Sequence, residues 1–355
     1  MFEAMAAARD HISLETYILD GGEIGERLAG LLAKKIDEGV KVNLIYDGVG
    51  SIGTPAAYFD RLRASGVAVC EFNPVSDVQR VNNRDHRKIL VVDGRVAFTG
   101  GINISEAYSM GSARARRTPQ KETKVGWRDT QVRVEGPAVR GLQRAFQENW
   151  SEITGEALVG PEFFPELPPV GSASAVVVPS SPLAAQSGAG RVYAVTLSAA
   201  AKEIWVGNSY FLPDEESTAL MVAAVKRGVD VRVIVPSDQH NDVPATKAAG
   251  RSSFGPLLQG GVRMFEYAPT MFHPKTIVVD GIFSTVGSAN FDDRSFHLNE
   301  EINVFVYDTA FAAQMREQYL RDLAKCNEYT LAMWNQRPLK KRITEWFAKP
   351  LRSEL

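Results

Sequence analysis

The sequence predicts an α/β fold of two fused modules related by a pseudo-twofold axis, each module a mixed β-sheet flanked by helices. One observation behind this prediction is a repeated motif, because a histidine, a lysine and an aspartate all recur 187 positions later. The two copies are His86, Lys88 and Asp93, and His273, Lys275 and Asp280. The other observation is that both halves show the same alternation of short apolar runs and helical patterns.

In the first half, the apolar runs and helical patterns follow the order of a sheet covered by helices. Strands are predicted at 12–19, 40–47, 67–72, 88–93, 96–100 and 128–135. Helices are predicted at 23–38, 55–65 and 137–150. The residues before the first strand have the pattern of the last turns of a helix, so we expect that further sequence precedes residue 1.

The second half repeats this order. Strands are predicted at 203–211, 229–235, 262–267, 275–280, 283–287 and 301–307, and helices at 215–227, 244–259 and 309–325. A proline-rich stretch between the halves indicates a boundary. We therefore expect a first module at 1–154, a linker at 155–172, a second module at 173–327 and a C-terminal segment at 328–355.

Composition and charge exclude several classes of protein. The 355 residues are 45% hydrophobic and 23% charged, which is the balance of an ordinary globular chain. A net charge of −2 gives no general attraction to an anionic polymer, so we expect no nucleic-acid partner. The two cysteines fit neither a disulfide framework nor a zinc cluster. No apolar run reaches the roughly 18 residues of a membrane span.

The spacing within each motif places the histidine and the lysine on one face of a strand, because side chains alternate with period two. Asp93 and Asp280 complete the catalytic motif but have the opposite parity, so we expect them to end the strand in a structural role. A neutral histidine is a nucleophile toward a phosphodiester. A lysine beside it stabilises the charge of the phosphoryl oxygens in the transition state.

Two motifs that face each other would form one site, in which one histidine attacks phosphorus and the other transfers protons. Because the lysines supply the positive charge, this chemistry needs no metal ion and no organic cofactor. A single copy of the motif would be compatible with an ordinary histidine and lysine on the surface of a strand. Two copies at corresponding places favour a shared site for phosphodiester transfer.

The chain resembles the phospholipase D superfamily. The resemblance rests on the two motifs and on the strings that follow them, Gly100-Gly-Ile-Asn103 and Gly287-Ser-Ala-Asn290. It implies that the phosphate pocket is lined by Asn103, Ser288 and Asn290. Gly101 departs from the serine of the superfamily, so one hydroxyl is absent in the first half.

The resemblance also implies that Asp129 and Glu301 each orient a histidine of the opposite half. A buried carboxylate facing an imidazole is the usual device for this purpose. The alternative is that both acids are charges at the start of a strand and face solvent.

The resemblance narrows to bacterial cardiolipin synthases and covers nearly the whole chain. It is carried by strings such as Asn82-Asn-Arg-Asp-His-Arg-Lys88, Trp127-Arg-Asp-Thr130 and Leu298-Asn-Glu-Glu301. It implies that two phosphatidylglycerols are joined through a phosphohistidine with release of glycerol, with His86 as nucleophile and His273 as acid and base. Phosphatidylethanolamine is an alternative donor. A hydrolytic phospholipase D or nuclease, and an inactive membrane-binding scaffold, are the competing functions.

Two basic segments favour contact with an anionic membrane surface. Residues 114–124 carry five basic residues and one acid, and are predicted as a loop over the site or a solvated loop. Residues 337–355 carry six basic residues and two acids together with Trp346 and Phe347. A helix packed on the domain is the alternative for this second segment. We expect a protein of the bacterial inner membrane surface, and the sequence leaves its oligomeric state open.

Overall fold

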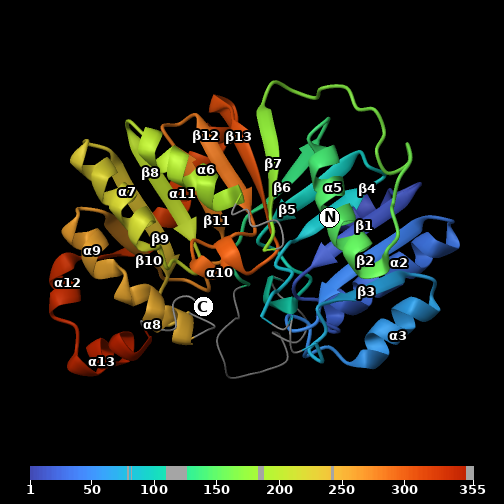
Figure 1. Ribbon diagram of the computed structural model, residues 1–355, viewed down its shortest axis with the longest axis horizontal. Helices are drawn as coiled ribbons and strands as arrows, with labels where there is room; N and C mark the ends of the chain where they lie inside the picture. The colour runs from blue at the N-terminus through green and yellow to red at the C-terminus, as the bar shows by residue number, and fades with distance from the viewer. Residues whose placement is uncertain (78–79, 81, 109–125, 183–187, 241–243, 349–355) are drawn as a thin grey trace.

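The chain folds into two α/β modules that lie beside each other, as the computed structural model shows (Figure 1). The structure describes residues 1–77, 80, 82–108, 126–182, 188–240 and 244–348. The predicted basic loop at 114–124 and the end of the chain from 349 onward lie outside the described residues.

The first module contains a six-stranded sheet in the order β3-β2-β1-β4-β5-β6. Its strands are β1 (His11–Thr16), β2 (Lys41–Asp47), β3 (Ala68–Phe72), β4 (Ile89–Val92), β5 (Val96–Gly100) and β6 (Gln131–Glu135). Its helices are α1 (Phe2–Ala6), α2 (Glu23–Asp37), α3 (Ala56–Ala64), the short η1 (Glu106–Tyr108) and α5 (Val139–Thr154). β1, β2 and β3 pair in parallel, whereas β4, β5 and β6 pair antiparallel.

Both faces of this sheet are covered by helices, and the alternation of side chains in β4 decides which residue meets which helix. Leu90 and Val92 pack in the core formed with α1, α2 and α3. Ile89 and Val91 pack in the core formed with α5 on the other face. A strand that is apolar on both faces reads as a continuous hydrophobic run, as this one does.

The second module contains an eight-stranded sheet in the order β14-β10-β9-β8-β11-β12-β13-β7. Its strands are β7 (Ser174–Ser180), β8 (Glu203–Asn208), β9 (Asp230–Pro236), β10 (Arg263–Tyr267), β11 (Lys275–Val279), β12 (Phe283–Gly287), β13 (Glu301–Tyr307) and β14 (Cys326–Tyr329). Strands β8 to β13 repeat the strand order and the directions of the first sheet. The predicted α/β fold of two related mixed sheets is confirmed.

The helices of the second module also cover both faces of its sheet. They are α6 (Gly188–Ala199), α7 (Glu215–Lys226), α8 (Pro244–Ser252), α9 (Phe254–Gln259), α10 (Asp293–His297), α11 (Thr309–Leu323), α12 (Leu331–Asn335) and α13 (Leu339–Ala348). α6, α7 and α9 share one core with the sheet, and Tyr319 of α11 packs on the opposite face.

Several elements differ from the sequence prediction. β7, α6 and β14 were not predicted, and β7 is an edge strand in which Val176 is 56% exposed, so it lacks the pattern of a buried strand. The single helix predicted at 244–259 is two helices, α8 and α9, which meet at Ser253. β14 spans residue 328, where the separate C-terminal segment was expected to begin.

The two modules meet along β5 of the first and β12 and β13 of the second. Ile302 of β13 is buried in the same core as Ile45, Ile89 and Phe146 of the first module. Residues 155–173 run between the modules without helix or strand, and Phe163 packs there on His11 with ring centroids 4.5 Å apart. The interface is therefore part of the hydrophobic core, which holds the two motifs in a defined relation.

Candidate functional site

The two motif segments lie at the interface between the modules in equivalent surroundings. Asp85, which precedes His86, forms a parallel bridge with Glu300 of the second module. Phe272, which precedes His273, forms the equivalent bridge with Arg128 of the first module. Glu301 follows Glu300 in sequence, and Asp129 follows Arg128. Each bridge therefore places a motif histidine beside an acid of the other module.

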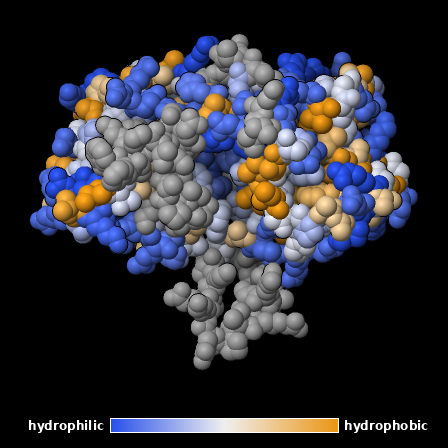
Figure 2. Space-filling view, turned by 60° about the horizontal axis from the view of Figure 1, so that its bottom comes forward, coloured by the Kyte–Doolittle hydropathy of each residue, from blue (hydrophilic) through white to orange (hydrophobic). Residues whose placement is uncertain are grey.

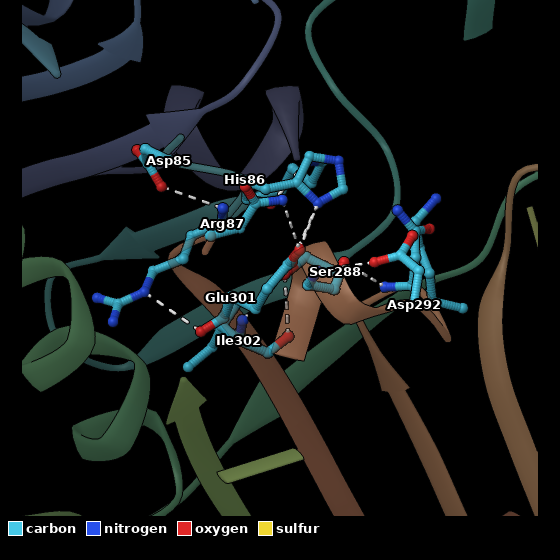
Figure 3. Close-up of polar contacts among 12 residues, drawn as sticks. Asp85, His86, Arg87, Ser288, Asp292, Glu301 and Ile302 are labelled. Carbon is cyan, nitrogen blue, oxygen red and sulfur yellow. Dashed lines mark hydrogen bonds and ion pairs between the residues drawn. The ribbon is translucent and has the colours of Figure 1, made fainter. Parts of the chain in front are cut away.

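Two histidine–carboxylate pairs cross the interface. Nδ1 of His86 lies 3.0 Å from both carboxylate oxygens of Glu301, as Figure 3 shows. Nδ1 of His273 lies 2.7 Å from Oδ2 of Asp129. An Nδ1–H that donates to a carboxylate leaves Nε2 with its lone pair, which is the atom that attacks or accepts a proton. Both acids lie where the resemblance implies, and neither faces solvent, because their side chains are 0% and 1% exposed.

The motif lysines are buried beside the histidines of their own modules. Nζ of Lys88 donates to the carbonyl oxygen of His86 at 2.6 Å. Nζ of Lys275 donates to the carbonyl oxygen of His273 at 2.7 Å and to the hydroxyl of Ser209 at 2.9 Å. Each lysine also acts electrostatically on the histidine of the other module. The four side chains therefore share one electrostatic environment.

Burial sets the protonation of the site. It lowers the pKa of His86 to about 4 against the opposing effect of Glu301. The pKa of His273 also falls to about 4, through burial and then the charge of Lys275. Burial lowers the pKa of Lys88 to about 7. At neutral pH both imidazoles are therefore neutral, which is the nucleophilic form.

Ser288 lies against the acid of the first dyad. Its side chain is fully buried and its hydroxyl donates to Oε2 of Glu301 at 2.5 Å, and a direct role at the substrate phosphate stays a prediction. Gly101 occupies the equivalent position in the first module, where a Cβ would lie 2.2 Å from Oδ1 of Asp129. The departure from serine therefore makes room for the carboxylate that orients His273.

Asn103 and Asn290 lie at equivalent places behind the motifs and are almost fully buried. Oδ1 of Asn103 accepts from the backbone N–H of Ile18, and its Nδ2 donates to the hydroxyl of Tyr108 at 2.9 Å. Oδ1 of Asn290 accepts from Ser209, the same hydroxyl that contacts Lys275. Both asparagines thus position groups of the site, and a direct role at the phosphate stays a prediction.

Asp93 and Asp280 lie at the far ends of β4 and β11, away from the histidines. The carboxylate of Asp93 accepts from the backbone N–H groups of residues 9–11 at 2.8–3.1 Å. The carboxylate of Asp280 accepts from those of residues 201–203 in the same way. Both residues have a left-handed backbone, with φ of 54° and 53°. Their place in the catalytic motif is therefore structural, since they tie the strand end to the adjacent strand.

Sequence reasoning missed two aromatic side chains that contact His273. The hydroxyl of Tyr108 lies 3.3 Å from Nδ1 of His273, and the ring of Trp127 lies 5.2 Å from the imidazole ring. Trp127 belongs to one of the strings that carry the resemblance, whereas no local pattern distinguishes Tyr108. On the other side, the ring of Tyr17 lies 5.1 Å from His86.

In the view of Figure 2, hydrophilic residues line a hollow between the two halves, and hydrophobic residues gather on part of its rim. Within the described ranges, no group of three histidine, cysteine, aspartate or glutamate side chains is arranged to hold a metal ion.

Two modules of one topology that share a site with two histidine–lysine pairs define a protein of the phospholipase D type. The family described as "Cardiolipin synthase, PLD-like domain" matches residues 1–115 and 193–323. The chain is 38% identical over 352 residues to "Cardiolipin synthase" of Geobacillus thermodenitrificans and 34% identical over 351 residues to that of Alkalihalophilus pseudofirmus. These alignments cover 97% of this chain and 68% and 67% of the relatives. The chain belongs to the cardiolipin synthase family of phospholipase D-like proteins.

Solved structures show the same fold. The phosphatidylserine synthase of Haemophilus influenzae is similar with a TM-score of 0.70 at 13% identity, over 100% of this chain and 92% of that one. The polyphosphate kinase of Porphyromonas gingivalis is similar with a TM-score of 0.60 at 13% identity, over 100% of this chain and 51% of that one.

Proposed function

We propose that the chain transfers a phosphatidyl group from one phosphatidylglycerol to the glycerol headgroup of a second, which forms cardiolipin and releases glycerol. The observation that carries this proposal is the pair of crossed dyads, His86 with Glu301 and His273 with Asp129, each beside a buried lysine. The relatives named cardiolipin synthase support the choice of lipid substrate.

In the first step, Nε2 of His86 attacks phosphorus and the P–O bond to the glycerol headgroup breaks. The leaving glycerol oxygen takes a proton from His273. Because burial and the charge of Lys275 hold the pKa of His273 at about 4, the negative charge of a bound phosphodiester is needed to favour its protonated form. Glu301 stabilises the imidazolium character that His86 acquires, and Lys88 and Lys275 stabilise the phosphoryl oxygens.

In the second step, a headgroup hydroxyl of the second phosphatidylglycerol gives its proton to His273 and attacks the phosphohistidine. The P–N bond breaks and His86 returns to its neutral form. The new phosphodiester replaces one of similar energy, so the covalent intermediate preserves the bond energy and no nucleotide is consumed. The choice of His86 as nucleophile follows the resemblance to the superfamily.

A lipid substrate requires contact with a membrane surface, and we place the chain at the bacterial inner membrane. α13 is a candidate contact element, because Leu339 is 68% and Ile343 48% exposed on a helix rich in basic residues. Lys341 is paired with Asp238, which ties one side of this helix to the segment after β9 of the second module. Among the described residues, none of the helices combines the length and the apolar character that a membrane crossing requires.

The test is incubation of the chain with vesicles of phosphatidylglycerol labelled in the headgroup and, separately, in the acyl chains. Cardiolipin together with labelled glycerol supports the proposal. Phosphatidic acid with glycerol, and no cardiolipin, would instead show a hydrolase with water as acceptor. Parallel vesicles that contain phosphatidylethanolamine show which lipid is the donor.

A further inference from the structure

The pseudo-twofold symmetry is broken immediately beside His86. In the first module the motif histidine lies between Asp85 and Arg87, and in the second module it lies between Phe272 and Pro274. Asp85 and Phe272 occupy equivalent backbone positions. Asp85 bridges the residue before Glu301, and Phe272 bridges the residue before Asp129. The two histidines therefore share backbone geometry but have different neighbours.

Arg87 crosses the interface between the modules, and its side chain is only 1% exposed. Its Nη2 donates to Oε2 of Glu300 at 2.7 Å and its Nη1 donates to the carbonyl oxygen of Ala145 in α5 at 2.8 Å. Its Nε lies 3.3 Å from the carbonyl oxygen of Glu301, as Figure 3 shows. His86 thus contacts the carboxylate of Glu301, and Arg87 contacts the backbone carbonyl of the same residue.

Asp85 belongs to a buried pair of carboxyls with Glu15 of β1, and the two side chains interact directly. One oxygen of each is bonded: Oε1 of Glu15 accepts from Asn149 at 2.6 Å, and Oδ1 of Asp85 accepts from the backbone N–H of Arg87 at 3.1 Å. The other oxygens, Oε2 of Glu15 and Oδ2 of Asp85, have no donor among the described residues. One proton between the two carboxyls would satisfy both oxygens.

The second module has an apolar counterpart at this place. Register along the sheet makes Gly207 the equivalent of Glu15, because Glu15 pairs with Ile89 and Gly207 with Thr276. A Cβ at Gly207 would lie 3.3 Å from the ring of Phe272. The phenyl ring therefore fills the space that the two carboxyls occupy in the first module.

We propose that Glu15, Asp85 and Arg87 form a positioning unit for His86, in which the two carboxyls share one proton and Arg87 holds the backbone of Glu301. The proposal rests on the proposed function, because it assigns the unit to the histidine that attacks phosphorus. The equivalent residues beside His273 are Gly207, Phe272 and Pro274, so the unit distinguishes the two histidines.

The charges around the unit explain why one proton is needed. The carboxyl pair faces Arg87 in its own module and Glu300 across the interface. The charge of Asp47, at the end of β2, also acts on Asp85. Two further charges lie close: Glu148 of α5 is 3.6 Å from Arg87, and Arg84 is 3.5 Å from Asp47. With both carboxyls ionised, Glu15, Asp85 and Glu300 would compete for one guanidinium and weaken its contact with Glu301.

The titration of the pair agrees with this geometry. Burial raises the pKa of Glu15 to about 7, against the attraction of Arg87, and it raises the pKa of Asp85 well above its usual range. Because the pKa of Glu15 is higher in the folded protein than its ordinary value of 4.5, protonation of Glu15 stabilises the fold. This stabilisation is fully present below pH 4.5 and is lost as pH rises through about 7. The raised pKa values of both carboxyls thus keep a proton on the pair through the acidic range.

The positioning role is tested with Arg87→Lys, which keeps the charge but cannot make the three contacts. The matched control is Arg227→Lys, because Nη2 of Arg227 donates to the carbonyl oxygens of Leu197, Ser198 and Ala200 beside the far end of β11. We expect Arg87→Lys to lower kcat about 10- to 100-fold with KM changed less than threefold, and the control to lower only thermal stability. In protein with ¹⁵N-labelled histidine, Arg87→Lys should shift the ring signals of His86 and leave those of His273 in place. A folded Arg87→Lys protein with wild-type kcat and an unchanged His86 signal would overturn the role.

The shared proton is tested with Glu15→Gln and Glu15→Ala. Glutamine can donate to Asp85 and still accept from Asn149, so we expect it to keep kcat within about threefold of wild type and to raise thermal stability above pH 8. Alanine should lower kcat and restore none of this stability. Equal loss of activity in both variants overturns the shared proton. The ¹³C carboxyl signal of Glu15 gives a readout independent of catalysis, because it should titrate near pH 7 even if the wild-type chain fails to make cardiolipin.

Discussion

Both carboxylate oxygens of Glu301 lie 3.0 Å from Nδ1 of His86, although 215 residues separate the two along the chain. The reverse relation holds between Asp129 and His273, which lie 144 residues apart with a contact of 2.7 Å. Each module therefore supplies the histidine of one dyad and the acid of the other. This exchange makes both histidines depend on the interface between the modules, and the predictions below follow from it.

The first prediction concerns the carboxylate of Glu301. Replacing it with glutamine removes the charge that stabilises a protonated His86, so kcat should fall about 10- to 100-fold. Ser288→Ala removes one donor to the same acid and should cost about 1 kcal/mol, or roughly fivefold in kcat. Glu328→Gln, an exposed partner of Arg263, is the control and should leave kcat unchanged. Wild-type turnover in Glu301→Gln would contradict an orienting role.

The second prediction concerns the pH dependence of kcat/KM. The reaction needs a neutral His86, with a pKa of about 4, and a protonated Lys88, with a pKa of about 7. Since the first step also needs a protonated His273, whose pKa is about 4, kcat/KM should be highest near pH 4 and should decline above it, more steeply as pH increases through about 7. Arginine keeps its charge at high pH, so the Lys88→Arg variant should lose the alkaline fall assigned to the lysine. The variant should also be less active than wild type at pH 6, because the guanidinium group differs from an ammonium group in shape. An unchanged alkaline limb would assign that ionisation to another group.

The third prediction separates Asp93 from the chemistry. Asp93→Ala removes the acceptor for the N–H groups of residues 9–11 and places alanine at a φ of 54°. The free energy of unfolding should decrease by about 1–3 kcal/mol, with kcat of the folded protein unchanged. Asp93→Asn keeps an acceptor oxygen and tolerates a left-handed backbone, so its loss should be smaller. Denaturant titration and kcat measured well below the melting temperature decide the matter. A kcat loss without a stability loss would place Asp93 in catalysis.

The fourth prediction is that activity survives a chelator. Lys88 and Lys275 lie beside the two histidines and supply the positive charge that a divalent ion supplies in other phosphoryl-transfer enzymes. Dialysis against EDTA should leave the initial rate unchanged within about twofold. A lost rate that a defined divalent ion restores would show that a metal takes part.

The fifth prediction concerns α13 and membrane contact. Lys341 is already paired with Asp238, so the basic residues left for a lipid surface include Lys340 and Arg342, both exposed. Reversing these two charges should weaken binding to phosphatidylglycerol vesicles, since each basic residue near an anionic surface contributes about 1 kcal/mol. The control reverses Lys34 and Lys41, which are 72% and 65% exposed on the first module. Equal binding by both variants at low salt would show that α13 only packs on its module. The side chains of Trp346 and Phe347 lie outside the described part of the chain.

The sequence by itself determined the two modules and the composition of the site. The apolar runs and a motif repeated 187 positions later are local signals, and the strands that follow the two motif histidines, β4 and β11, are buried at every position. They predicted the strands that follow His86 and His273, and the parity argument separated Asp93 and Asp280 from the histidines. The resemblance added Asp129 and Glu301 as acids that act on the opposite half.

The tertiary structure decided what each supporting side chain does. Ser288 has the sequence context of a phosphate ligand, but its hydroxyl meets Glu301, and Gly101 is a glycine because Asp129 occupies the space of a side chain. Glu15 belongs to a strand with no motif, and its partner Asp85 lies 70 positions away. Such contacts join residues that are distant in the chain, and they depend on how the modules pack, so no local periodicity encodes them.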